Sequence, residues 1–179
     1  MIYCGPGWGP NNNGAHSGGS AVLSMETGSR ATLTFTGTGV SWIGFRDQWS
    51  GIANVYIDGV QKATVDTYAS PQKNQVVNYS ISNLSSGSHT ISIEVAGARN
   101  LASAGRWIWI DAFDVTGSSG GGGSASITPD PEPTVPSAPS TPTPIPTITK
   151  IQQNGAGVNF SGVWGSNTNA IHSGGTARL

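Results

Sequence analysis

Charged side chains are scarce in this sequence, and their signs nearly cancel. Lys, Arg, Asp and Glu make up 9% of the 179 residues, far below the roughly 25% of an average soluble domain. With 8 basic and 9 acidic residues, the chain has no basic field that would attract nucleic acid or anionic lipid. Its polar surface must be built from Ser, Thr, Asn and Gly, which suits sugar binding or close packing against other molecules.

Cysteine and long apolar runs are also lacking. Cys4 is the only cysteine, so no intrachain disulfide can form; we interpret it as a small apolar residue, with an intermolecular bridge as the alternative. No apolar run reaches the roughly 20 residues of a membrane span, and residues 1–6 lack the charged and apolar regions of a signal peptide. The sequence therefore predicts no membrane span and does not reveal a route of export.

Residues 20–115 consist of short alternating runs rich in Val, Ile, Thr and aromatic residues, separated by Gly, Asn, Asp and Ser. About eight such runs with no helical period predict an all-β fold, an antiparallel β-sandwich of the jelly-roll type. Asp58 and Gly59 between two runs predict a hairpin with a type I′ turn. The predicted core consists of the apolar residues on one face of each strand, namely Leu33, Phe35, Val55, Ile57, Ile91, Ile93 and Ile110.

The composition changes abruptly after residue 115, which gives three predicted parts. Residues 1–115 form the sandwich module, and residues 116–147 form a Gly/Ser-rich and then Pro/Thr-rich linker. Its proline-rich part favours extended polyproline II and can reach roughly 60 Å at about 3.1 Å per residue. Residues 148–179 are the opening strands of a second copy, because residues 164–179 match residues 8–23 at ten of sixteen positions.

The segment before the repeated stretch predicts a strand without a sheet of its own. Residues 148–153 have strand-like Ile spacing and no counterpart before Met1 in the first copy. A sandwich that lacks this strand has unpaired backbone groups at an open edge, and the tail strand can repair that edge. The residues predicted to mediate this assembly are Ile148, Lys150, Ile151, Gln153, Val158 and Phe160. The tail can pair with the next copy, head to tail, or fold back on its own sandwich.

Four segments in fixed order, residues 31–40, 51–59, 87–91 and 109–115, carry a family resemblance. They resemble the galactose-binding-like, carbohydrate-binding-module-like jelly-roll repeats of bacterial secreted or cell-surface proteins. The resemblance implies an extracellular location, tandem use with Thr-Pro-rich linkers and, in many relatives, carbohydrate binding. It also implies a structural calcium ion, for which Asp111 is the only candidate ligand.

Catalysis has little support in the sequence, so we expect no enzyme activity. The three histidines, His16, His89 and His172, form no metal-spaced cluster and lie beside no nucleophile motif. Asp111 and Asp114 fall on opposite faces of a regular strand, which argues against a glycosidase pair of carboxylates.

One aromatic residue suggests a sugar site. Most Trp and Phe residues lie in strands and are interpreted as core, but Trp49 lies in a polar loop beside Arg46 and Asp47. An exposed indole stacks on a pyranose ring while polar neighbours bind its hydroxyl groups, so these three residues are the candidate sugar site. Folding of the indole back onto the body of the domain is the alternative.

Two functions therefore remain open. The first is a non-catalytic repeat that builds a cell-surface fibre or filament through copies of itself, by strand complementation. The second is a carbohydrate-binding module of a larger secreted protein, with a polysaccharide as its partner. Both fit the same fold, because sandwiches host many functions. We rank the fibre first.

Overall fold

A computed structural model describes residues 7–117, 147–152 and 158–161. The fold is all-β, as the sequence predicts, and it consists of antiparallel sheets with one short 3-10 turn at Ser17–Gly19 among the described residues. No helix in the described part of the chain is long and apolar enough to cross a membrane.

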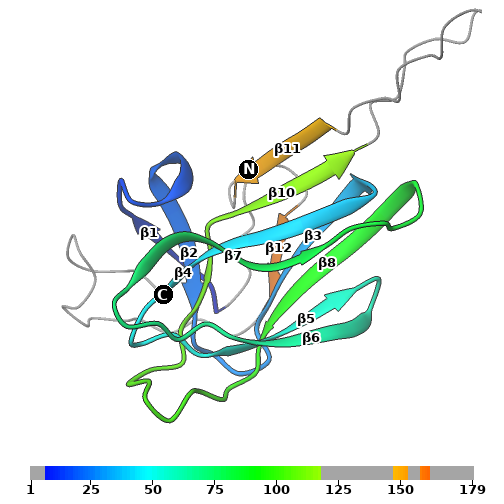
Figure 1. The fold of residues 1–179 in the computed structure, drawn as a ribbon. Helices are drawn as coiled ribbons and strands as arrows, with labels where there is room; N and C mark the ends of the chain where they lie inside the picture. Colours follow the sequence, from blue (N-terminus) through cyan, green and yellow to red (C-terminus); the bar gives the residue numbers. More distant parts are fainter. Residues whose placement is uncertain (1–6, 118–146, 153–157, 162–179) are drawn as a thin grey trace, which may run out of the picture.

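Two larger sheets pack against each other, and a smaller one lies beside them (Figure 1). The five-stranded sheet has the order β12 (Val158–Ser161), β3 (Arg30–Gly37), β8 (Gly87–Val95), β5 (Ile52–Ile57) and β6 (Val60–Asp66). The four-stranded sheet has the order β11 (Thr147–Gln152), β10 (Ala112–Gly117), β4 (Gly39–Arg46) and β7 (Lys73–Ile81). The smaller sheet contains β1 (Gly9–Asn12), β2 (Ser20–Ser24) and β9 (Ile108–Ile110).

The core lies between the two larger sheets and follows the period of two along each strand. In β3 and β8, Leu33 and Ile93 are fully buried, while the residues on either side of them are partly or fully exposed. All seven predicted core residues belong to this one cluster, to which Trp8, Trp42 and Phe113 add large aromatic side chains. The predicted core is therefore confirmed.

The predicted hairpin turn is confirmed as well, because Asp58 and Gly59 both have positive φ, 50° and 77°. The turn is tied to β8 by the Asp58 carboxylate, which accepts the Thr90 N–H at 2.7 Å and lies 2.7 Å from His89 Nδ1. His89 Nε2 lies 2.8 Å from the Ser85 carbonyl oxygen. The hydrogen bonds to Asp58 and to Ser85 favour the imidazolium, so they raise the pKa of His89 above its ordinary value.

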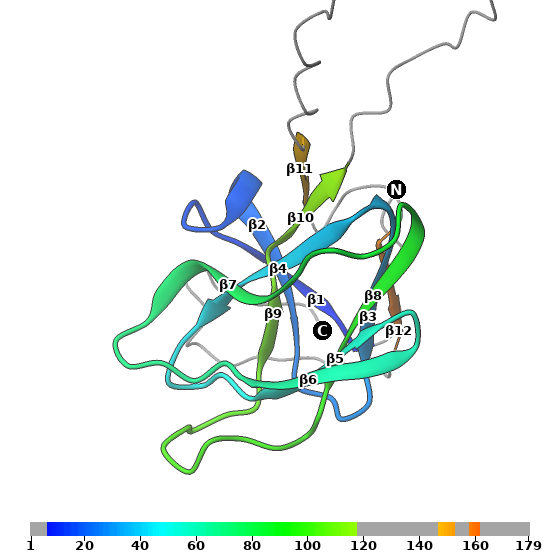
Figure 2. The same cartoon turned by 45° about the vertical axis from the view of Figure 1, so that its right-hand side comes forward.

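The tail adds one strand to each larger sheet of its own chain (Figure 2). β11 pairs with β10, with Lys150 opposite Asp114, and β12 pairs with β3, with Val158 opposite Leu33. Of the two pairings that the sequence left open, the structure has the one within the chain.

The tail residues predicted to mediate assembly contribute unequally. Ile151 packs against the core, and Lys150 Nζ lies 3.2 Å from Asp114 Oδ1. Ile148 is 67% exposed and contributes little burial. β12 contains Val158 and Phe160, whereas Gln153 and the second copy of the repeat, residues 164–179, lie outside the described residues.

Shortening a central core side chain should cost substantial stability. Leu33→Ala and Ile93→Ala each leave a cavity between the sheets, for which we expect about 2–5 kcal/mol of lost unfolding free energy in urea titrations. Thr34→Ala, at an exposed position of the same strand, is the matched control and should change stability by less than about 0.5 kcal/mol. Losses below about 0.5 kcal/mol at both core positions would contradict the packing described above.

Candidate functional site

The loop predicted to bind sugar is held rigidly by its own polar groups. Asp47 Oδ1 accepts the Trp49 N–H at 2.9 Å and the Ser50 hydroxyl at 2.7 Å, so this carboxylate stabilises the turn. Arg46 Nε donates to Asn78 Oδ1 at 2.7 Å. Asp47 and Arg46 are therefore largely engaged within the protein.

The Trp49 indole is half-buried and not fully exposed. It packs with Phe45 against a small cluster formed by Ala21, Leu23, Trp107 and Trp109. The loop also bonds to its neighbour, since Trp107 N donates to the Trp49 carbonyl oxygen at 3.1 Å. A Cβ at Gly105 would lie 2.5 Å from that oxygen, so the close approach requires glycine. The alternative of an indole that folds back onto the domain describes this geometry better than a protruding indole does.

His16 lies in the same aromatic region and is buried, with 4% of its surface exposed. Its Nε2 lies 3.1 Å from Asn11 Oδ1, and its ring centroid lies 5.7 Å from that of Trp109. Burial lowers the pKa of His16 below its ordinary value. An imidazole packed among aromatic rings, with Asn11 as its hydrogen-bond partner, is a structural group.

Asp111 is fully buried beneath the loop of residues 13–19. Its Oδ1 accepts the Ser17 N–H at 2.8 Å, and Oδ2 has no partner among the described residues. Burial raises the pKa of Asp111 to about 6, although the bond from Ser17 and the charge of Lys150 oppose the shift.

The calcium ion that the resemblance implies at Asp111 stays a prediction. The described residues contain no group of three or more His, Cys, Asp and Glu side chains that could hold a metal ion. Calcium requires about six to eight oxygen ligands, whereas the Asp111 carboxylate already uses one oxygen to hold Ser17. The contact that the structure shows for Asp111 is the structural one to Ser17.

Replacing Asp111 by asparagine should stabilise the protein at high pH. Because the folded-state pKa lies above the ordinary value, the folded protein binds the proton more tightly, and stability falls as pH rises from about 4 to 6. Above that window the ionised carboxyl remains buried at a cost on the order of 1–3 kcal/mol. Asp111→Asn removes this cost, so urea titrations should find the variant more stable at pH 8 and nearly equal at pH 4.

A lower stability of the Asp111→Asn variant at pH 8 would indicate that Asp111 is a metal ligand. If Asp111→Asn is less stable than the parent chain at pH 8 in the presence of calcium, and a chelator abolishes that difference, then the structural assignment is wrong. A difference that is the same at every pH would contradict the raised pKa.

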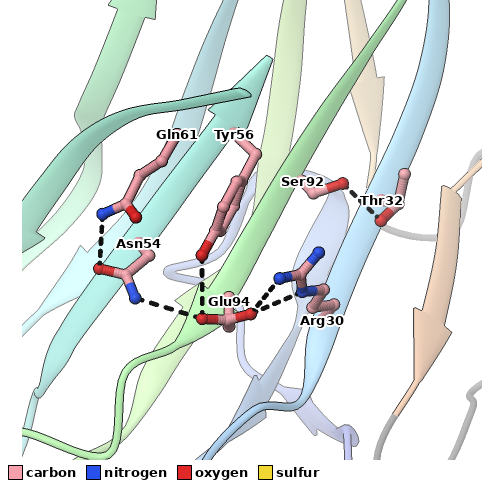
Figure 3. A network of polar contacts seen from close by, with 7 residues as sticks. All are labelled: Arg30, Thr32, Asn54, Tyr56, Gln61, Ser92 and Glu94. Carbon is pink, nitrogen blue, oxygen red and sulfur yellow. Dashed lines mark hydrogen bonds and ion pairs between the residues drawn. The ribbon is translucent and has the colours of Figure 1, made fainter. Parts of the chain in front are cut away.

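A second polar surface, which sequence reasoning did not single out, covers the outer face of the five-stranded sheet (Figure 3). Its centre is Glu94, whose carboxylate accepts Arg30 Nε at 2.6 Å and also contacts Arg30 Nη2. On the other side the same carboxylate accepts Asn54 Nδ2 and Tyr56 Oη, each at 3.2 Å. Burial opposes ionisation of Glu94, but the bonds from Asn54, Arg30 and Tyr56 outweigh it and lower its pKa.

The network continues across the neighbouring strands. Gln61 Nε2 donates to Asn54 Oδ1 at 3.2 Å and to Thr64 Oγ1 at 3.1 Å, and Thr64 Oγ1 donates to Asn54 Oδ1 at 2.9 Å. Between β3 and β8, Thr32 Oγ1 and Ser92 Oγ lie 2.8 Å apart. The alternation of β3, β5 and β8, from which the core was predicted, also implied this face, but only the register shows which of its residues are neighbours.

Comparisons with known proteins add relatives that act on carbohydrates. No family model matches the chain. It is 34% identical over 93 residues to an A type blood N-acetyl-alpha-D-galactosamine deacetylase of Flavonifractor plautii, covering 52% of this chain and 12% of that protein. It is 36% identical over 93 residues to an A type blood alpha-D-galactosamine galactosaminidase of the same organism, covering 52% of this chain and 8% of that protein.

Among solved structures, a Paenibacillus xanthan lyase is similar with a TM-score of 0.46 and 18% sequence identity, over 58% of this chain and 11% of the lyase. The chain therefore spans about a tenth of the length of each curated relative that it matches. The matched region is a short part of two large proteins named for their action on sugars.

Proposed function

We propose that this chain is a non-catalytic carbohydrate-binding module of a larger secreted or cell-surface protein. The observation that carries the proposal is its identity of 34% and 36% to short parts of two carbohydrate-acting enzymes. A part of that size is too small to represent their whole activity, and it suits an accessory module that holds the enzyme near its substrate. The carboxylates of Asp47 and Asp111 are engaged within the protein.

The relatives thus favour the second of the two functions that the sequence left open. Neither relative's name refers to a fibre. The low charge and the Ser-, Thr- and Asn-rich surface, which the two functions share, are consistent with sugar binding.

Binding to glycans should be measurable with the full chain. Because both relatives are named for A type blood sugars, the probes are a blood-group A glycan conjugate and neutral polysaccharides of galactose or glucose. We expect at least one probe to retard the chain in affinity electrophoresis or to bind it in calorimetry, with a Kd in the micromolar to millimolar range. Absence of binding to every probe would overturn the proposal.

A second candidate function, strand complementation between copies, is favoured by the position of β11 and β12. One segment after the linker completes the edges of both larger sheets, beside β10 and beside β3. Thr147 lies opposite Gly117 in the register. A hairpin loop of about 2–5 residues is enough to connect two residues in that position. Residues 118–146, which separate the two strands, are far more than such a loop needs, and their proline-rich composition predicts an extended chain. The same two strands can therefore reach a neighbouring copy and pair with it in the same register.

Cysteines at paired positions distinguish exchange from closure. In a Cys4→Ser background, Asp114→Cys and Lys150→Cys are placed in separate chains, which are mixed, allowed to exchange and oxidised. Because these residues lie opposite each other in β10 and β11, complementation between copies should give a disulfide-linked dimer on non-reducing gels.

The matched control pairs Lys150→Cys with Ser41→Cys, which lies one strand further away on β4, and it should give little dimer. A chain with both Asp114→Cys and Lys150→Cys should crosslink internally. If only that double variant crosslinks, and the mixed chains give no more dimer than the control, complementation between copies is wrong.

A further inference from the structure

The geometry points to the outer face of the five-stranded sheet as the glycan-binding surface, with a neutral, polyhydroxylated chain lying across the strands. This inference rests on the proposed function and says where the ligand binds and what charge it carries. The face is built from β3, β8, β5 and β6, whose other face packs into the core.

The strand register arranges the outward side chains of this face in two parallel rows. One row runs from Arg30 through Glu94 and Asn54 to Thr64. The next row runs from Thr32 through Ser92 and Tyr56 to Gln61. In the backbone register, β12 lies beside β3, with Ser161 opposite Arg30 and Asn159 opposite Thr32. With strands about 4.8 Å apart, a row across the four strands β3, β8, β5 and β6 is about 14 Å long, enough for several sugar rings.

Both rows carry groups that can bond to sugar hydroxyls. The hydroxyl groups of Thr32, Ser92 and Thr64 each donate and accept, so they retain capacity beyond their mutual bonds. The Gln61 side-chain oxygen accepts from no residue that the structure describes, and this side chain is exposed. A sugar hydroxyl also both donates and accepts, so it can bond anywhere along such a surface.

The long side chains of the face are already ordered. Arg30 bonds to Glu94, and its guanidinium carbon lies 4.5 Å from the centroid of the Tyr56 ring. Tyr56 is fixed at its other end by the bond from Oη to Glu94. A ligand that meets these groups does not have to order flexible side chains, which reduces the entropic cost of binding.

The charge of the two rows selects the class of ligand. Arg30 and Glu94 are the only charged residues in the two rows, and they neutralise each other. Lys62, an exposed cation at the register shift of β6 beside Gln61, adds one positive charge at the end of the face. An acidic polysaccharide would meet no other cation than this one and the paired Arg30 along the two rows, and a cationic one would meet only the paired Glu94. A neutral glycan needs no charged partner on such a surface, because its contacts are hydrogen bonds and ring contacts with Tyr56 and the planar guanidinium of Arg30.

Other parts of the described surface fit less well. Beside the four-stranded sheet, the loop of residues 13–19 covers Asp111 through Ser17 N–H and accepts a bond from Gln75 at the Ala15 carbonyl oxygen. The Trp49 loop directs its carboxylate inward. Within the described residues, the outer face of the five-stranded sheet presents an open, pre-ordered array of hydroxyl and amide groups, whereas the four-stranded sheet carries the Ser41–Ser80 hydroxyl pair.

The test compares variants of the face with a variant of the loop, in the full chain and with the same glycan probes. Asn54→Ala removes a donor to Glu94 and an acceptor for Gln61, and Gln61→Ala changes an exposed side chain that the fold does not need. Each should weaken binding about fivefold or more, the effect of losing one net hydrogen bond. Trp49→Ala and the control Ser41→Ala, on the exposed face of the other large sheet, should leave the affinity unchanged.

The outcomes separate the site from the function. If the parent chain binds a glycan and both face variants bind it equally well, the inference is wrong while the proposed function stands, and a loss with Trp49→Ala alone would move the site to the loop. If the parent chain binds no probe, the function fails and the inference fails with it. Affinity for the neutral probe should be the same at about 0.05 and 0.5 M salt. Binding only to an acidic polysaccharide that salt abolishes would overturn the stated ligand class.

Discussion

The period-two alternation of three neighbouring strands, β3, β8 and β5, produces both the core and the candidate binding face. Leu33, Ile93 and Val55 point between the sheets, and the residues next to them point outward into the polar rows. A shift of one residue in the register would move the apolar set to the solvent and the polar set into the core. The buried face therefore fixes the register, and the register fixes which hydroxyl, amide and charged groups lie side by side. Stability and recognition are two consequences of one constraint.

This constraint explains why much of the fold could be predicted from the sequence. Burial in a half-exposed strand follows directly from alternation, so the core residues and the Asp58–Gly59 turn were found without a structure. Loops have no such period. Trp49 appeared exposed because its neighbours in the sequence are polar, but those neighbours bond to the loop backbone and the indole turns toward Trp107. In the Arg30–Glu94–Tyr56 network, Glu94 is 64 positions away from Arg30 and 38 positions away from Tyr56. Only the order of the strands brings these residues together.

The flank of the sandwich shows a second limit of sequence reasoning. The spacing of Ile148 and Ile151 correctly indicated a strand, and the unpaired edges required one. Yet alternation does not say which sheet a strand joins or whose sheet it is. Ile151 meets the core and Ile148 does not, because Ile151 lies opposite the inward-facing Phe113 while Ile148 lies opposite Thr116. Within the chain and between chains the same hydrogen bonds form, so the choice depends on the effective concentration set by the linker.

Because charged residues are scarce, the surroundings of each ionised side chain largely determine its role. Arg30 and Glu94 lie on the open face, where water and several hydrogen bonds stabilise both ions, and their partners order the side chains around them. Asp111 is the contrasting case, because it is buried with a single backbone donor and its pKa rises to about 6. The first arrangement keeps a carboxylate ionised at the centre of a neutral surface; the second uses a carboxyl to fix the loop of residues 13–19. A neutral ligand is the natural partner for the first arrangement, since it gains hydrogen bonds there without having to strip water from an unpaired charge.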